Sequence, residues 1–226
     1  MGMGMPEKIP WPFTRLYDRY PNRIFAKWFK RIANDIRDRP VSGTILDVGT
    51  GPGRLPIEIA KQVADVEIVG IDISEDMVKI AKRNAEEEGL AERVRFRVGS
   101  AYDTGFADCS IDLVVSTGMI HHLKEPVDAF NEFCRILKRG GEAWIYDGRK
   151  DATKGEIEET VQGLGIEGDL PVPLWIIESI WSYWHIGYKT EVYVSGRIGR
   201  SLGESLFKDY GVEKEGAYVR IMLKKT

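Results

Sequence analysis

The segment at residues 44–60 reads TILDVGTGPGRLPIEIA. A short apolar run ends at Asp47, glycines follow at positions 49, 51 and 53, and apolar residues then recur at helical spacing. This order predicts a strand, a glycine-rich turn and a helix. Glycine lets a backbone turn sharply and approach a ligand closely, where a Cβ would clash. Such a turn lies at the carboxyl edge of a parallel sheet, where nucleotide-like ligands bind.

The spacing of these glycines is D-x-G-x-G-x-G, with Arg54 directly after Gly53. A dinucleotide-binding turn has the pattern G-x-G-x-x-G, so this spacing argues against a nicotinamide-dependent oxidoreductase. A tight strand–helix turn without a ligand is the alternative interpretation of this segment taken alone.

The acidic residue Asp72 ends a second predicted strand, VEIVGI at 66–71, about 20 residues beyond the glycine turn. A carboxylate at that place can accept hydrogen bonds from both hydroxyls of a ribose. The alternative role for Asp72 is to cap the next helix. Ser74 is available as the N-cap of that helix, and Gly89 marks its end, so the ribose role is favoured.

Helical patterns alternate with five predicted strands, which lie near 44–48, 66–71, 93–98, 111–115 and 141–147. This alternation indicates an α/β fold in which helices cover both faces of a parallel sheet. The length of 226 residues predicts a single domain, 1–226. Two segments fall outside the core: a helical region at 13–38, expected to cover the site, and an aromatic insertion at 148–190, expected to form a lid.

The composition argues against several classes of protein. The formal net charge of −3 does not suit a dedicated nucleic-acid binder. Cys109 and Cys134 are far apart and form no C-x-x-C, so neither a metal site nor a disulfide framework is predicted. No apolar run approaches the ~20 residues that span a bilayer, so we expect a cytoplasmic protein without a membrane partner. The sequence indicates no oligomeric state.

Four stretches carry a family resemblance: DVGTGPG (47–53), GIDIS (70–74), VRFRVGSAYDTGFADCSIDLVVSTGMIHHL (94–123) and EPVDAFNEFCRILKRGGEAWIYD (125–147). In these stretches the chain resembles class I S-adenosylmethionine-dependent methyltransferases of the small-molecule type. The resemblance implies an α/β, doubly wound, Rossmann-like seven-stranded sheet. The sheet would be mostly parallel and would carry a C-terminal antiparallel hairpin strand near 217–224. The resemblance also implies S-adenosyl-L-methionine as the cofactor.

By the same resemblance, the turn backbone would lie against the methionine part of the cofactor, and Asp47 would orient the turn or bind the amino group. Asp72 would bind the ribose. The adenine would pack on Ile73, beside a loop where the family often has an acid and this chain has Ser100, with Asp103 as a substitute. The full set of expected cofactor-binding residues is Asp47, Gly49, Thr50, Gly51, Gly53, Asp72, Ile73, Ser100, Ala101, Ser116, Thr117 and Tyr17.

The candidate catalytic residues are His121 and His122, which follow the fourth predicted strand on the acceptor side. Histidine titrates near neutrality and can act as a general base. The alternative is that the pair only belongs to the recurrent family pattern, with one ring capping the next helix.

The predicted reaction is methyl transfer to a small-molecule acceptor by in-line displacement. A sulfonium is already an excellent leaving group, so the enzyme's main task is to align the acceptor with the methyl group. Two alternatives stay open: a non-catalytic module that binds S-adenosylmethionine, and a methyltransferase acting on protein or RNA. The segment after the fourth strand reads STGM, not the D-P-P-Y type expected for methylation of a base amine, which favours a small molecule.

Overall fold

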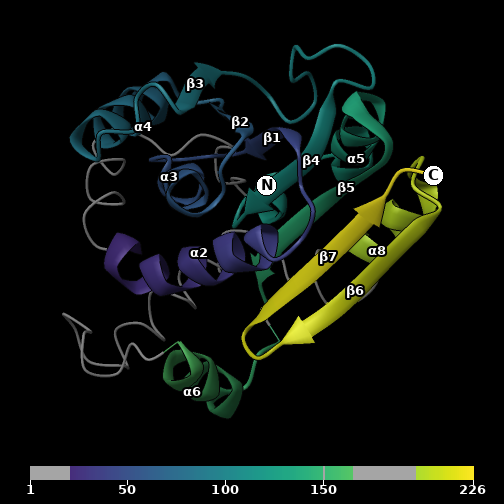
Figure 1. The fold of residues 1–226 in the computed structure, drawn as a ribbon. Coiled ribbons are helices and arrows are strands. Elements are labelled where there is room, and N and C mark those ends of the chain that lie inside the picture. Colours follow the sequence, from purple (N-terminus) through teal and green to yellow (C-terminus); the bar gives the residue numbers. More distant parts are fainter. Residues whose placement is uncertain (1–20, 150, 165–196) are drawn as a thin grey trace, which may run out of the picture.

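The computed structural model describes residues 21–149, 151–164 and 197–226 (Figure 1). Its seven-stranded sheet has the order β3-β2-β1-β4-β5-β7-β6. Strands β1 to β5 pair in parallel, whereas β7 pairs antiparallel with both β5 and β6. The predicted doubly wound α/β sheet with its C-terminal hairpin is therefore confirmed. The strands are β1 (Gly43–Val48), β2 (Val66–Asp72), β3 (Val94–Val98), β4 (Ile111–Thr117), β5 (Leu137–Gly148), β6 (Asp209–Glu215) and β7 (Tyr218–Lys224).

Helices lie on both faces of the sheet, with α2, α3 and α4 on one face and α5 and α8 on the other (Figure 1). No helix in the described parts of the chain is long and apolar enough to cross a membrane. The helices are α2 (Pro21–Arg37), α3 (Arg54–Gln62), α4 (Glu75–Glu87), α5 (Pro126–Ile136), α6 (Lys154–Gly163) and α8 (Arg197–Glu204), with a 3-10 helix η1 (Ile120–His122).

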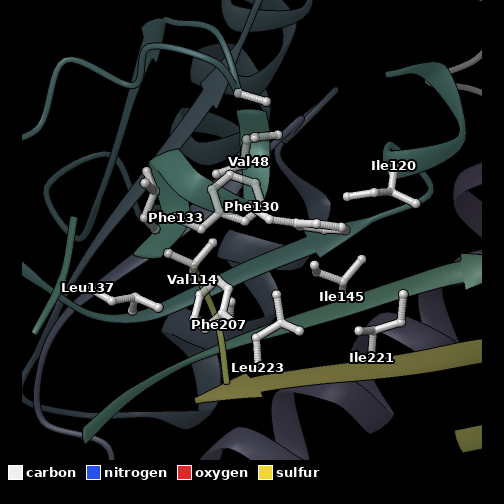
Figure 2. Close-up of a cluster of buried hydrophobic side chains, with 14 of the residues drawn as sticks. Val48, Val114, Ile120, Phe130, Phe133, Leu137, Ile145, Phe207, Ile221 and Leu223 are labelled. Atoms are coloured by element: carbon white, nitrogen blue, oxygen red, sulfur yellow. The ribbon is translucent and has the colours of Figure 1, made fainter. Parts of the chain in front are cut away.

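Residues of β1, β2, β4, β5 and β7 contribute to two buried apolar clusters, one under each helical layer. In β1, Ile45 joins the cluster beneath α2 and α3, whereas Leu46 and Val48 join the cluster beneath α5 and α8. Figure 2 shows the second cluster, in which Phe130 and Phe133 of α5 pack over the sheet. Burial of each large apolar side chain contributes roughly 1.5–3 kcal/mol to the stability of the fold. The ends of the strands are therefore supported by a well-packed core.

Helix α2 is anchored by aromatic contacts to the two strands beneath it. The ring centroid of Trp28 lies 6.1 Å from that of Tyr146, edge-on at 90°, and 5.6 Å from that of Tyr218. Residues 13–20 of the predicted cover and 165–190 of the predicted lid lie outside the described residues. The cover, the lid and the single-domain boundary therefore stay predictions.

Candidate active site

A pocket opens where the carboxyl ends of the parallel strands meet. Half of the residues that line it were expected from the sequence, and half were not. The expected ones are Gly49, Gly51, Asp72, Ile73, Ser100, Ala101, Thr117 and His122. The others are Val48, Ser74, Met77, Gly99, Tyr102, Gly118, Met119 and Leu123. The pocket thus combines the glycine turn, the end of β2, the loop after β3 and the segment after β4.

The glycine turn is held against the neighbouring strand β2 by its backbone. The N–H groups of Gly49 and Thr50 both donate to the carbonyl oxygen of Ile71, at 2.9 Å each. Gly51 has φ +52°, and a Cβ built on it would meet no atom within 4 Å. The left-handed φ favours glycine at this position, and the open space above Gly51 belongs to the pocket, because Gly51 lines it.

Gly49 and Gly53, on either side of Gly51, are required by the packing of the protein. A Cβ on Gly49 would lie 2.5 Å from Cγ of Met119, and a Cβ on Gly53 would lie 2.6 Å from Cζ of Phe96. Both contacts are closer than real Cβ atoms allow. Gly53 does not line the pocket; it lets the start of α3 pack closely against the sheet, whereas Gly49 lets the Met119 segment approach the turn.

Asp72 ties the turn to the next helix. Its Oδ2 accepts a hydrogen bond from the Gly51 N–H at 2.9 Å, and its Oδ1 accepts one from the Ser74 N–H at 2.8 Å. The Ser74 hydroxyl in turn accepts from the Met77 N–H at 3.4 Å, so Ser74 is the N-cap of α4, as predicted. Asp72 remains half-buried at the pocket wall, with its carboxylate oriented by two backbone donors.

Asp47 lies beneath the glycine turn rather than on the pocket surface, with 1% of its surface exposed. Burial raises the pKa of its carboxyl to about 7; the neighbouring Thr50 side chain acts to lower the pKa, and the nearby charge of Asp72 adds to the rise. Its Oδ1 has no hydrogen-bond partner among the described residues. A buried carboxylate oxygen without a hydrogen-bond partner destabilises the protein, and a cationic group bound at the turn would reduce this destabilisation.

The loop after β3 lines the pocket with residues 99–102 and is attached to α5. Oε1 of Glu132 accepts hydrogen bonds from the N–H and the hydroxyl of Thr104, at 2.8 and 2.7 Å. Burial acts to raise the pKa of Glu132, but hydrogen bonds from Arg135 and Thr104 outweigh it and hold the pKa below its ordinary value. The charged carboxylate therefore fixes this wall.

Several expected site residues lie off the pocket surface. Ser116 is fully buried and donates its hydroxyl to the Val48 carbonyl at 2.8 Å. Thr50 is buried beneath the turn, and the substitute acid Asp103 is exposed and accepts from the Gly105 N–H at 3.3 Å. Tyr17 lies outside the described residues.

The two histidines occupy different positions. His122 lines the pocket, whereas His121 is 8% exposed and points its ring at Asp147 on β5. Nδ1 of His121 lies 2.8 Å from Oδ1 of Asp147, and the His121 N–H donates to Oδ2 at 3.2 Å. The two imidazole rings lie 4.0 Å apart between centroids, tilted by 40°. The buried ring of His121 thus packs against the ring of His122, the residue that lines the pocket.

The Asp147 carboxylate favours the protonated form of His121. Burial acts to lower the pKa of His121, and the adjacent Asp147 carboxylate more than offsets it, so the pKa is raised. The Gly148 N–H also donates to Oδ1 of Asp147, at 2.8 Å. Asp147 was missed in the sequence, although it ends a buried strand just as Asp72 does. The same strand-end rule would have found it.

A seven-stranded Rossmann-like sheet with a glycine turn and a strand-end acid beside one pocket defines a methyltransferase-type fold. Residues 41–180 match the family model described as methyltransferase domain, so the chain belongs to this family.

Similar proteins support this placement. Ubiquinone/menaquinone biosynthesis C-methyltransferase UbiE of Geotalea uraniireducens (strain Rf4) is 34% identical over 149 residues, which cover 62% of this chain and 63% of the relative. The chain thus spans less than two thirds of that relative's length. The structure of a SAM-dependent methyltransferase from Aquifex aeolicus has a TM-score of 0.68 at 20% identity, covering 96% of this chain and 98% of the other, which shows a shared fold.

Proposed function

We propose that the chain transfers a methyl group from S-adenosyl-L-methionine to a small-molecule acceptor. The observation that carries this proposal is the open space above Gly51, which is bounded by the oriented carboxylate of Asp72. Open space above a glycine backbone, beside a strand-end acid, is what close approach of a nucleoside ligand needs.

The residues present fit this cofactor. Asp72 would bind the ribose, Ile73 is 43% exposed at the pocket and would pack on the adenine, and the Gly51 backbone would lie along the methionine part. The buried Oδ1 of Asp47 is the acceptor that the α-ammonium of the cofactor would satisfy through a water. Ser100 would contribute at the adenine edge.

When bound, S-adenosylmethionine supplies an electrophilic methyl group on a sulfonium that leaves readily. The chain's own residues align the acceptor and exclude water. Met77, Met119 and Leu123 give the pocket apolar walls that serve this exclusion. An acceptor that is protonated at working pH also needs a base.

His122 is the residue we propose for that role, because it lines the pocket after β4. Its ring would accept a proton from an acceptor hydroxyl, amine or acidic carbon during in-line attack. His121 lies behind it, fixed by Asp147, and would act only through His122. The apolar lining favours a small, largely apolar acceptor. The named biosynthesis of quinones by the UbiE relative supports the same class.

Calorimetry tests the cofactor assignment. S-adenosylmethionine and its demethylated product S-adenosylhomocysteine should bind, and NAD should not. Methyl-labelled cofactor incubated with a metabolite pool then tests turnover: label should appear in a small molecule with the wild type, and much more slowly with Asp72→Ala when the cofactor is not saturating. Binding without any transfer would instead support a non-catalytic module. Label in protein or RNA would support the other alternative. The cytoplasmic location expected from the sequence stays a prediction.

A further inference from the structure

Tyr102 connects two walls of the pocket. It lies on the loop after β3, lines the pocket half-buried, and packs against the apolar cluster beneath α5. Its phenolic oxygen accepts hydrogen bonds from the backbone N–H of Lys124 at 3.0 Å and from that of Glu125 at 3.4 Å. These donors lie on the segment after β4, directly beyond His122.

The two donors lie where a helix normally needs a cap. Glu125 is the N-cap of α5 and makes no side-chain capping hydrogen bond, and Pro126 at the first helical position has no N–H. The phenol of Tyr102 therefore accepts from the N-cap residue and from the residue before it, so it fixes the chain where α5 begins, whereas a capping serine or aspartate would accept from N–H groups inside the first turn. Its effect falls on the backbone that carries His122 and Leu123 into the pocket.

Tyr102 is itself held on a firm loop. Its N–H donates to the Ser100 hydroxyl at 3.2 Å, which fixes the residue relative to the adenine side of the pocket. Further along, Arg135 of α5 donates to the Phe106 carbonyl at 2.8 Å. The loop is thus attached to α5 at both ends, and Tyr102 is the attachment that also faces the pocket.

We propose that Tyr102 is a positioning residue that couples the adenine side of the pocket to the acceptor side. Its ring forms part of the wall, and its hydroxyl fixes the segment that presents His122. A cofactor that presses on the ring therefore adjusts the acceptor side. This inference rests on the proposed function, because it takes the pocket as the cofactor site and His122 as the acceptor-side group.

The test uses Tyr102→Phe, which keeps the ring and removes the hydroxyl. Tyr210→Phe, on the exposed face of β6, is the matched control. Amide exchange at Lys124 and Glu125 should rise about fivefold in Tyr102→Phe, the factor expected for the loss of one hydrogen bond. The control should exchange like the wild type.

A second measurement separates positioning from simple structural support. The chain has three histidines, so ring resonances can be assigned by single substitution to glutamine. Saturating S-adenosylhomocysteine should shift the His122 ring resonances in the wild type and in Tyr210→Phe. In Tyr102→Phe that shift should fall to less than half, while the Kd for S-adenosylhomocysteine changes less than threefold.

Three results would overturn the inference. Unchanged exchange at both amides would show that the hydroxyl does not hold the segment. A full His122 response in Tyr102→Phe would show that the two walls are not coupled. A tenfold loss of affinity would place the hydroxyl on the cofactor itself. Failure of the wild type to bind S-adenosylhomocysteine is a different outcome, because it refutes the proposed function and removes the basis of the coupling.

Discussion

Replacing Asp47 by Asn should stabilise the ligand-free protein at neutral pH and weaken its binding of S-adenosylmethionine. Burial raises the pKa of Asp47 from 3.8 to about 7, so the folded protein holds this proton more tightly than the unfolded chain does. The stability that Asp47 contributes is therefore fully present below about pH 4 and is lost as the pH rises through about 7. Asn keeps the shape of the neutral carboxyl and does not titrate, so the variant avoids this loss.

The size of the effect follows from the pKa difference. At 1.36 kcal/mol per pH unit, a pKa raised from 3.8 to about 7 corresponds to about 4 kcal/mol between acidic and alkaline limits. Between pH 5 and pH 8, the free energy of unfolding of Asp47→Asn relative to the wild type should rise by about 3 kcal/mol. A change of this size is a large share of the stability of a typical domain.

Urea unfolding of both proteins at pH 5, 6, 7 and 8 measures this difference. All other groups titrate in both proteins, so the difference between the two curves isolates Asp47. Calorimetry with S-adenosylhomocysteine at pH 8 should show roughly three- to tenfold weaker binding for the variant, because the Asn amide oxygen still accepts a hydrogen bond but carries no charge, and a charge-assisted hydrogen bond is about twice as strong as a neutral one. A stability difference that is constant from pH 5 to 8, or unchanged affinity at pH 8, would refute the reasoning.

Three further substitutions test other parts of the pocket. Asp72→Ala should weaken S-adenosylhomocysteine binding at least tenfold without unfolding the chain. The variant loses the two charge-assisted hydrogen bonds that the carboxylate would accept from the ribose hydroxyls, each worth roughly 1.5–3 kcal/mol. Calorimetry measures the affinity, and circular dichroism checks the fold. Gly51→Val should abolish binding, whereas Gly89→Val, with a similar positive φ far from the pocket, should show the backbone strain alone; equal binding by both would remove Gly51 from the site. Asp147→Asn should destabilise the protein by about 3 kcal/mol, because it breaks a buried ion pair. The raised pKa of His121 makes that loss larger at pH 6 than at pH 9, so equal losses in urea unfolding would contradict the pairing.

Much of the fold could be predicted because its signals are local. The apolar runs, the glycine turn and the Ser74 cap each lie within a few residues, and the structure places β1, β2 and α4 where these signals put them. The strand β5 was predicted at 141–147 but begins at Leu137. Its first residues include Gly140 and Gly141, which read as a turn in the sequence. They nevertheless extend the strand, because Leu137 pairs with Ile111 across a register shift and Gly140 bonds to the end of the chain.

The sequence predicted the residues on the cofactor side of the pocket better than those on the acceptor side. Gly51 follows β1 and Asp72 ends β2. These two strands are parallel neighbours, so their carboxyl ends lie side by side, and both residues line the pocket. Sequence position could not tell which of several adjacent residues faces inward. Thr117 lines the pocket, but Ser116 next to it points its hydroxyl back at Val48. Adjacent residues at a strand end point to opposite sides, so a one-residue difference decides between wall and core.

The acceptor side depends on contacts between segments that are distant in the sequence. His121 and Asp147 are separated by 26 positions and meet because Thr117 pairs with Tyr146 in the parallel register of β4 and β5. That register places the segment after β4, which carries His121 on η1, next to the end of β5, so the Asp147 carboxylate meets the side chain of that segment that turns inward. It assigns the two histidines, alike in the sequence, to different places: the first to a buried pair, the second to the pocket. The base that we propose for this chain therefore could not be chosen from the His-His dipeptide alone, because the partner that distinguishes the two rings comes from the neighbouring strand.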